Sequence, residues 1–202
     1  MSIAADPKRY HHGELRAALI AAALEALERD GPAALSLRGL ARAIGVSPMA
    51  PYHHFADRAA LLAAVAAAGF ERLQQRKLAV QADAGDDPAE ALVAGSASYV
   101  AFVLDNPNLY RLMKGPEFAE PSRYPELQRA AAAPAETLLA MIGRLIEERG
   151  LPGLDPAACA VELWALAHGA GTLALDGQLT RDQAEHAARE GARSMIKGWL
   201  VA

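Results

Sequence analysis

The stretch that decides the fold runs from residue 36 to residue 58 and reads SLRGLARAIGVSPMAPYHHFADR. Its first half carries apolar residues at the spacing of one helix face, namely Leu37, Leu40, Ala41 and Ile44. Ser36 is a suitable N-cap for this helix because its hydroxyl can accept a backbone N–H. The pattern predicts an amphipathic helix from residue 36 to residue 44.

A turn and a second helix are expected directly after it. Gly45 stands where a turn between crossed helices requires a positive φ, and Val46 fills the corner. Ser47 is suited to cap the second helix, and Pro48 fits its first position. Pro51 lacks the N–H that would normally bond the Ser47 carbonyl, so we expect a helix with a tight first turn. Two short helices joined in this way form a helix-turn-helix, whose second helix enters the major groove of DNA.

The same stretch resembles the N-terminal DNA-binding domain of the TetR/AcrR family of transcriptional regulators. That family ends its recognition helix with a Tyr-x-x-Phe element, followed by an acidic cap, a basic residue and an apolar helix. The matching residues here are Tyr52, His53, His54, Phe55, Asp57, Arg58, Leu61 and Leu62. A preceding helix over residues 14–30 also fits, and the resemblance covers residues 10–73.

The resemblance implies an all-α protein with two functional parts. An N-terminal arm and three-helix helix-turn-helix DNA-binding domain would occupy residues 1–56, and the family-type domain extends to about residue 73. A connecting helix over 57–80 would lead to a C-terminal helical bundle over 81–202, for ligand binding and dimerisation. Composition agrees, since 52% of residues are hydrophobic, only 5% are aromatic, and alanine and leucine abound.

The C-terminal part divides into several expected helices after a loop over 81–88. These helices cover residues 88–105, 106–113, 129–149, 155–175 and 180–199, with a loop over 115–125. Pro134 marks either the start of its helix or a kink. A second resemblance rests on Trp164, His168 and Gly169, which form the Trp-x-x-x-His-Gly (WHG) element of one TetR branch. Residues 106–113 are also similar to that branch.

The resemblance and the residue chemistry together indicate a set of DNA contacts. The candidates are Arg38, Ser47, Pro48, Met49, Ala50, Tyr52, His53, His54 and Arg58. By resemblance, Tyr52 and Arg58 would hold the DNA backbone. The candidates for base edges are mostly apolar, which favours thymine methyl contacts and shape readout. The alternative is that these are solvated surface residues.

The basic N-terminal arm has two open interpretations. Lys8, Arg9, His11 and His12 could reach along the duplex, or they could form a disordered arm.

Aromatic, methionine and histidine side chains in the C-terminal part are candidates to line a ligand cavity. They are Tyr99, Phe102, Tyr110, Met113, Phe118, Met141, Trp164 and His168. Trp164 and His168 are four residues apart and therefore share a helix face. An apolar pocket with one titratable group suits a small, partly apolar effector. For each residue the alternative is plain core packing.

Charge and composition limit the classes of function. Residues 1–77 hold ten Lys and Arg against seven Asp and Glu, whereas the remainder is acidic, which fits a basic DNA-binding part on an acidic body. No hydrolase, phosphate-loop or metal motif occurs, so we expect no enzyme, no cofactor and no metal. The adjacent pairs His11–His12 and His53–His54 point about 100° apart on a helix, which disfavours chelation.

The single cysteine and the absence of a leader-like segment favour a cytoplasmic, nucleoid-associated protein. Cys159 has no internal partner for a disulfide, which suits a reducing compartment, and we expect it to pack as a small buried residue. No membrane-spanning segment is expected.

These observations predict a one-component transcriptional regulator, a repressor in the sense that effector binding releases it from DNA. It would bind palindromic operator DNA as a homodimer, pairing through its last two helices. The alternatives are a ligand-independent DNA-binding protein and a helical protein-interaction module.

Overall fold

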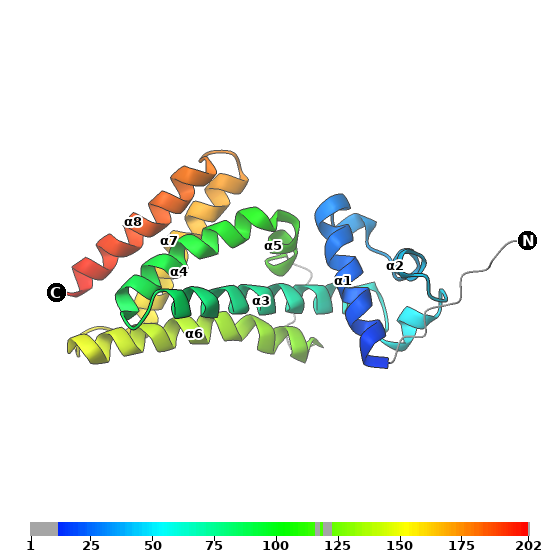
Figure 1. The fold of residues 1–202 in the computed structure, drawn as a ribbon, viewed down its shortest axis with the longest axis horizontal. Coiled ribbons are helices and arrows are strands. Elements are labelled where there is room, and N and C mark those ends of the chain that lie inside the picture. The colour runs from blue at the N-terminus through cyan, green and yellow to red at the C-terminus, as the bar shows by residue number, and fades with distance from the viewer. Residues whose placement is uncertain (1–11, 116–117, 119–122, 202) are drawn as a thin grey trace, which may run out of the picture. The chain divides into compact units, whose positions relative to one another are not determined.

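A computed structural model describes residues 12–115, 118 and 123–201, and the part described is helical with no strand. Two of its elements, η1 and η2, are 3₁₀ helices, and the α-helices can be followed by their labels in Figure 1. The elements follow in the order α1 (His12–Asp30), η1 (Pro32–Ala34), α2 (Leu37–Ile44), η2 (Ala50–His53), α3 (Arg58–Asp83), α4 (Pro88–Asp105), α5 (Pro107–Met113), α6 (Pro125–Arg149), α7 (Pro156–Leu175) and α8 (Arg181–Trp199). The all-α prediction is confirmed.

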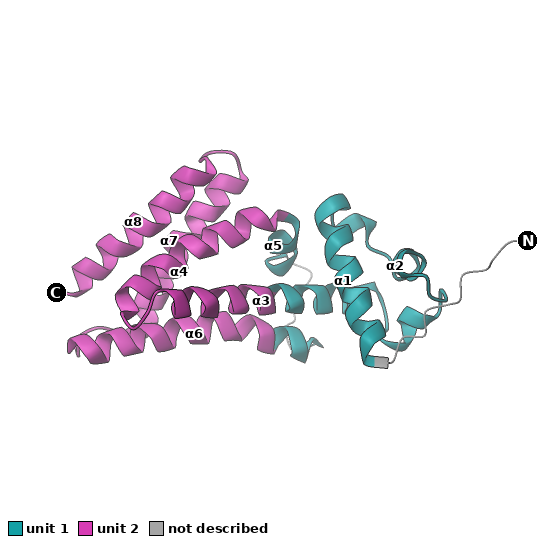
Figure 2. Ribbon diagram, viewed as in Figure 1, with its two compact units in different colours: residues 1–69, 108–128 teal, residues 70–107, 129–202 magenta. Residues whose placement is uncertain are grey.

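The chain forms two compact units (Figure 2). Unit 1 comprises residues 1–69 and 108–128, and unit 2 comprises residues 70–107 and 129–202. Helix α3 therefore contributes its first half to unit 1 and its second half to unit 2. Residues 108–128 belong with the N-terminal elements although they lie far along the sequence, and sequence reasoning had placed them in the C-terminal part.

The core of unit 1 follows the apolar spacing of its helices. Leu19, Ala23 and Leu27 of α1 are fully buried at intervals of four residues. Helix α2 buries Leu37, Leu40 and Ala41, as its spacing predicted. The start of α3 adds apolar side chains to the same unit, including Leu61, Leu62 and Val65. These contacts fix α2 against α1 because both helices bury one continuous apolar face.

The turn after α2 has the predicted geometry. Ser36 Oγ accepts the Gly39 N–H at 3.1 Å and so caps the helix. Gly45 has a φ of 76°, a left-handed conformation that favours glycine. The Val46 N–H returns to the Ala41 carbonyl at 2.9 Å, which satisfies a carbonyl at the end of the helix.

The second helix of the motif differs from the expected α-helix. Residues 50–53 form the short 3₁₀ helix η2, and Ser47 is not its N-cap. Because Pro51 has no N–H, the Ser47 carbonyl instead accepts the Ala50 N–H at 3.0 Å, three residues on. The Pro51 ring is fully buried. The prediction of an α-helix here was wrong, and the tightening that Pro51 imposes extends through the segment.

Helix α5 packs closely against α3 within unit 1. A Cβ on Gly69 would lie 2.7 Å from the Met113 sulfur and 2.9 Å from a methyl carbon of Leu109. Any larger residue at position 69 would therefore require the Met113 and Leu109 side chains to shift.

Unit 2 is a helical bundle with its apolar core between α4, α6, α7 and α8. One buried cluster consists of Leu92, Val93, Ile142, Leu145, Cys159, Leu163, Ala192 and Ile196. Asp87, Asp155 and Thr180 cap α4, α7 and α8, so these helices begin where the sequence predicted. Helix α6 begins at Pro125, earlier than the expected residue 129, and Pro134 lies inside it.

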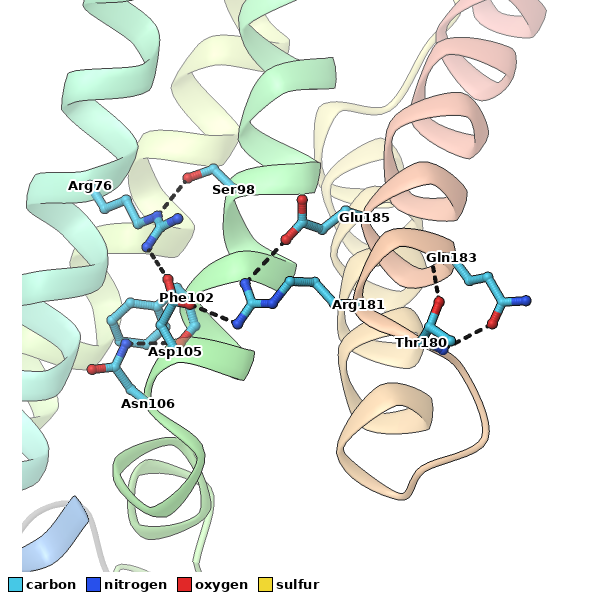
Figure 3. A network of polar contacts seen from close by, with 9 residues as sticks. All are labelled: Arg76, Ser98, Phe102, Asp105, Asn106, Thr180, Arg181, Gln183 and Glu185. Atoms are coloured by element: carbon cyan, nitrogen blue, oxygen red, sulfur yellow. Dashed lines mark hydrogen bonds and ion pairs between the residues drawn. The ribbon is translucent and has the colours of Figure 1, made fainter. Parts of the chain in front are cut away.

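A polar network ties α3, α4 and α8 of unit 2 together at the end of α4 (Figure 3). Asp105 pairs with Arg76 at 3.0 Å and with Arg181 at 2.8 Å. Arg76 also donates to Ser98 Oγ at 3.0 Å. Burial alone would raise the pKa of Asp105, but the hydrogen bonds from both arginines outweigh it and lower that pKa below its usual value.

Candidate nucleic-acid interface and ligand-binding region

The segment after Gly45 presents its side chains to solvent. Met49 is 62% exposed and Tyr52 is 40% exposed, and Ser47, Pro48 and His53 are exposed as well. Ala50 and His54 are half-buried. Large apolar side chains held outward on a well-packed segment favour contact with another molecule.

A surface hollow gathers three of the predicted DNA contacts. It is lined by Ser36, Leu37, Arg38, Tyr52, Ala56, Asp57 and Arg58. Arg38 comes from the start of α2, Tyr52 from η2 and Arg58 from the start of α3. The hollow therefore combines two guanidinium groups and a phenol, which are typical partners of a phosphate.

Arg58 is also part of the internal structure of unit 1. Its guanidinium donates to the Leu35 carbonyl at 3.0 Å and to the Pro32 carbonyl. The neighbouring Asp57 caps α3 by accepting the Ala60 N–H at 2.8 Å. Arg58 thus holds the α1–α2 connection against the start of α3, a role that sequence reasoning did not foresee. Its predicted role in DNA binding remains a prediction.

The predicted ligand-lining residues fall in both units. In unit 2, Phe102 is buried, while Tyr99, Met141 and His168 are half-buried. In unit 1, Tyr110 and Met113 are buried, and Phe118 is half-buried with its ring 6.0 Å from that of Tyr124. The structure does not bring all eight residues together within one unit.

Trp164 lies at the surface of unit 2. It is 44% exposed, and its ring lies 5.1 Å from the ring of His168. The Tyr99 hydroxyl approaches His168 Nδ1 at 3.5 Å. Half-buried Tyr99 and His168 remain candidates for a ligand site, whereas the exposure of Trp164 favours a contact surface.

Helix α7 exposes apolar side chains that unit 2 does not cover. Val161 is 61% exposed and Leu173 is 41% exposed, alongside Trp164. Within the described ranges, α7 is also the one helix long and apolar enough to cross a membrane by length and composition. Only 28% of its most apolar window is buried.

Sequence reasoning missed a polar cluster between α3 and α6. Lys77 Nζ donates to the Pro134 carbonyl at 2.7 Å, and Gln74 Nε2 donates to Thr137 Oγ1 at 2.8 Å. Burial lowers the pKa of Lys77 to about 8. A lysine and a glutamine on a helix usually indicate a solvated face, so the sequence carried no signal that this cluster would be desolvated.

Neither a reactive thiol nor a metal site is indicated among the described residues. Cys159 is buried, and burial, with Glu162 and Asp155, raises the pKa of its thiol, as suits the expected packing role. Across the ranges that the structure describes, no group of three or more His, Cys, Asp or Glu could hold a metal ion. His11 lies outside the described residues, as do Lys8 and Arg9 of the arm.

The fold and the exposed motif define a helix-turn-helix DNA-binding regulator with a helical C-terminal bundle. Comparison with known families agrees over both parts. The family described as bacterial regulatory proteins, tetR family, matches residues 19–65. The family described as tetracyclin repressor-like, C-terminal domain, matches residues 92–197. The chain belongs to the TetR family of transcriptional regulators, and it is not an enzyme. The resemblance to the WHG branch stays a prediction.

Solved structures share the fold over nearly the whole chain. A protein of unknown function from Rhodococcus sp. RHA1 is 32% identical, with 95% of this chain and 98% of that chain covered and a TM-score of 0.83. The TetR family transcriptional regulator PfmR from Thermus thermophilus is 20% identical, with 89% of this chain and 97% of that chain covered and a TM-score of 0.65.

A third structure carries a ligand. A TetR variant from Acinetobacter baumannii AYE in complex with minocycline is 24% identical, with 95% of this chain and 97% of that chain covered and a TM-score of 0.59. Among proteins of curated function, no sequence matches this chain.

Proposed function

We propose that this chain is a homodimeric repressor that binds palindromic operator DNA and is released by a small-molecule effector. Membership of the TetR family supports the class of regulator. The observation that carries the DNA-binding part is the outward display of Met49 and Tyr52 beside the hollow that contains Arg38 and Arg58. The site of action is the cytoplasm, at the nucleoid.

The geometry of unit 1 suits one half-site of an operator. Met49 projects from the tight segment after Ser47 and offers an apolar contact to thymine methyl groups. Arg38 and Tyr52, which line the neighbouring hollow, would hold the sugar-phosphate backbone. In a two-fold dimer, two such surfaces contact successive major grooves about 34–36 Å apart.

The uncovered face of α7 supports dimerisation through the last two helices. Val161 and Trp164, about 60° apart around α7, expose apolar surface that a second copy would bury. A two-fold dimer pairs this face with its own counterpart, so each protomer presents the same residues. In this proposal Trp164 is an interface residue. The exposed apolar side chains of α7 face a helix of the second copy and not lipid.

The connection between α4 and α5 supports a route from effector to DNA. Glu28 of α1 accepts the Leu109 N–H at 2.8 Å, and Asn108 donates to the Leu27 carbonyl at 3.1 Å. One residue, Asn106, separates α4 of the effector-binding bundle from α5. A ligand that shifts the end of α4 therefore pulls on α1 through these bonds, and repression ends through differential binding to two states.

The test is retardation of promoter DNA from the neighbourhood of its own gene. The full-length chain should retard this fragment at low salt and release it at high salt, because Lys and Arg contacts displace counter-ions. Tyr52→Phe removes only a hydroxyl and should weaken retardation without changing the fold. Retardation that is equal for the variant and the native protein would contradict the proposed docking.

Effector release and dimerisation need separate readouts. Sedimentation should show a dimer, and Trp164→Glu should shift it toward monomer while the circular dichroism spectrum stays helical. If no metabolite in a thermal-stabilisation screen changes DNA retardation, a ligand-independent DNA-binding protein becomes the better assignment.

A further inference from the structure

The side chain of Lys77 is half-buried, and its amine is largely desolvated. Its Nζ reaches across from α3 to α6 and donates to the neutral Pro134 carbonyl at 2.7 Å. In the part of the chain that the structure describes, no carboxylate lies within ion-pair distance of this amine. The adjacent Arg76 differs sharply, because it pairs with Asp105. One carbonyl meets only one of the three donors of an ammonium group.

A second unmet polar group lies one helical turn away. Gln74 and Lys77 are three residues apart on α3 and so share a face. Gln74 Nε2 contacts Thr137 Oγ1 at 2.8 Å, and Gln74 Oε1 is buried with no hydrogen-bond partner. The side-chain amide can be turned over, in which case the Thr137 hydroxyl donates to Oε1 and the NH₂ group is left to donate. Buried polar groups are rarely left without partners, so each such group calls for an explanation.

We propose that this cluster, Lys77, Gln74 and Thr137, recognises the carboxylate group of the effector. One carboxylate oxygen accepts from Lys77 Nζ, and the other accepts from the Gln74 amide in its turned orientation. This proposal rests on the proposed function, because it names the chemical class of the effector that would release the repressor from DNA.

The surroundings favour a monoanion on a partly apolar molecule. The cluster offers one positive charge and two neutral groups, which balance a carboxylate but leave a phosphate dianion with an uncompensated buried charge. Met141 lies one turn beyond Thr137 on α6 and packs against the apolar core of the bundle. An apolar body attached to the carboxylate would therefore find apolar side chains beside it.

The binding test uses three matched pairs of probes on the full-length protein. Benzoate, hexanoate and decanoate are compared with benzamide, hexanamide and decanamide at millimolar concentration by calorimetric titration. At least one carboxylate should bind at least roughly 10-fold more tightly than its amide, since hydrogen bonds to charged groups are the stronger ones. Equal binding of acids and amides, or no binding by any acid, would overturn the proposal.

A direct readout at the amine accompanies the titration. With lysine labelled at Cε, the signal of Lys77 is assigned by Lys77→Arg and followed against pH. Bound carboxylate should move its midpoint upward from about 8 by roughly one pH unit or more, because an opposite charge favours the protonated form. A midpoint unmoved by a carboxylate that binds would place that ligand elsewhere and overturn the proposal.

Three variants test whether the probes bind at this cluster or respond only to the overall charge of the protein. Lys77→Met should lower carboxylate affinity at least roughly 10-fold. Arg72→Met, on the exposed face of the same helix, removes the same charge and should leave affinity unchanged. Gln74→Glu supplies an internal carboxylate next to Lys77 and should block binding of the probes. If Lys77→Met and Arg72→Met weaken binding equally, the cluster is not the site.

Retardation of promoter DNA distinguishes the failure of this proposal from failure of the proposed function. A carboxylate that binds at Lys77 and weakens retardation supports both. Binding that leaves retardation intact overturns the effector role of the carboxylate. Absence of retardation by the ligand-free protein contradicts the proposed function, whatever the probes do.

Discussion

The two units of the chain use positive charge in opposite ways. In unit 1, Arg38 and Arg58 stand at the surface around a hollow that also contains Tyr52. In unit 2, the half-buried Lys77 lies between α3 and α6, and its one hydrogen bond among the described residues goes to the Pro134 carbonyl. A solvated cation can exchange its counter-ions for DNA phosphates, whereas a buried cation without a counter-ion destabilises the fold until a ligand neutralises it. In the two proposals above, the placement of charge thus separates a surface for DNA from a site for one small anion.

The largest expected effect is on DNA binding by the exposed charges. Arg38→Gln should weaken operator binding by roughly 10- to 100-fold at low salt, and the dimer presents the change twice. The slope of log affinity against log salt should become shallower by about 2, as two phosphate contacts are lost. Fluorescence anisotropy over a salt series measures both quantities.

The matched control for this change lies one turn further along α2. Arg42 is also exposed but does not line the hollow, so Arg42→Gln should have a much smaller effect. Equal losses from the two variants would mean that the overall charge of unit 1, and not the hollow, governs binding.

The buried charge should respond in the opposite sense, with a gain in stability when it is removed. Lys77→Met should raise the free energy of unfolding by on the order of 2 kcal/mol near neutral pH, because it removes an unpaired buried cation and loses one hydrogen bond. Urea unfolding at pH 7 measures the change. A loss of stability would show that the amine is better solvated than its contacts indicate.

Lys77 should also make the free energy of unfolding depend on pH, in a direction that follows from its lowered pKa. Burial lowers the pKa of Lys77 from 10.5 to about 8 in the folded chain, so between these values the unfolded chain binds the proton that the folded chain has released. Stability should therefore rise with pH across this window and the rise should be absent in Lys77→Met. Unfolding curves from pH 7 to pH 10.5 on both proteins test the difference.

A smaller effect is expected where α5 joins unit 1. Glu28→Ala removes the acceptor of the Leu109 N–H and should lower the free energy of unfolding by about 1–2 kcal/mol. Hydrogen exchange at the amides of Asn108 and Leu109 should quicken. Glu28→Gln keeps an oxygen acceptor and should restore most of the protection, while exposed Glu25→Ala on the same helix should change neither quantity.

The smallest expected effect concerns the paired charges of unit 2. Asp105 and both of its arginine partners are more than a third exposed, so Asp105→Asn should cost less than about 1 kcal/mol at pH 7. The folded-state pKa of Asp105 is lowered, so its contribution should be present above the unfolded pKa and fade as the pH falls through the folded value. Native protein and variant should then become equally stable in acid, as thermal unfolding would show.

Most helix boundaries could be predicted because they depend on residues close in sequence. Ser36, Asp155 and Thr180 cap the helices that follow them, and Gly45 takes the positive φ that its turn requires. Apolar spacing identified the buried faces of α1 and α2. Capping, helix periodicity and turn conformation act over three or four residues, so the sequence contains all the information they need.

Other features depended on which side chains meet across the fold. Local chemistry indicated a helix with a tight first turn at Pro51, whereas residues 50–53 form the 3₁₀ helix η2 and the Pro51 ring is fully buried. The sequence alone also predicted Trp164 as a pocket residue, whereas it stands 44% exposed on α7.

The amino-acid pattern was enough to indicate the family and the order of the helices. Packing across the fold was needed to place residues 108–128 with the N-terminal unit and to desolvate Lys77. The physical reason is one of range along the chain. Hydrogen bonds within a helix join residues that are close in sequence, whereas the desolvation of a side chain depends on residues that are far away in the chain and pack against it.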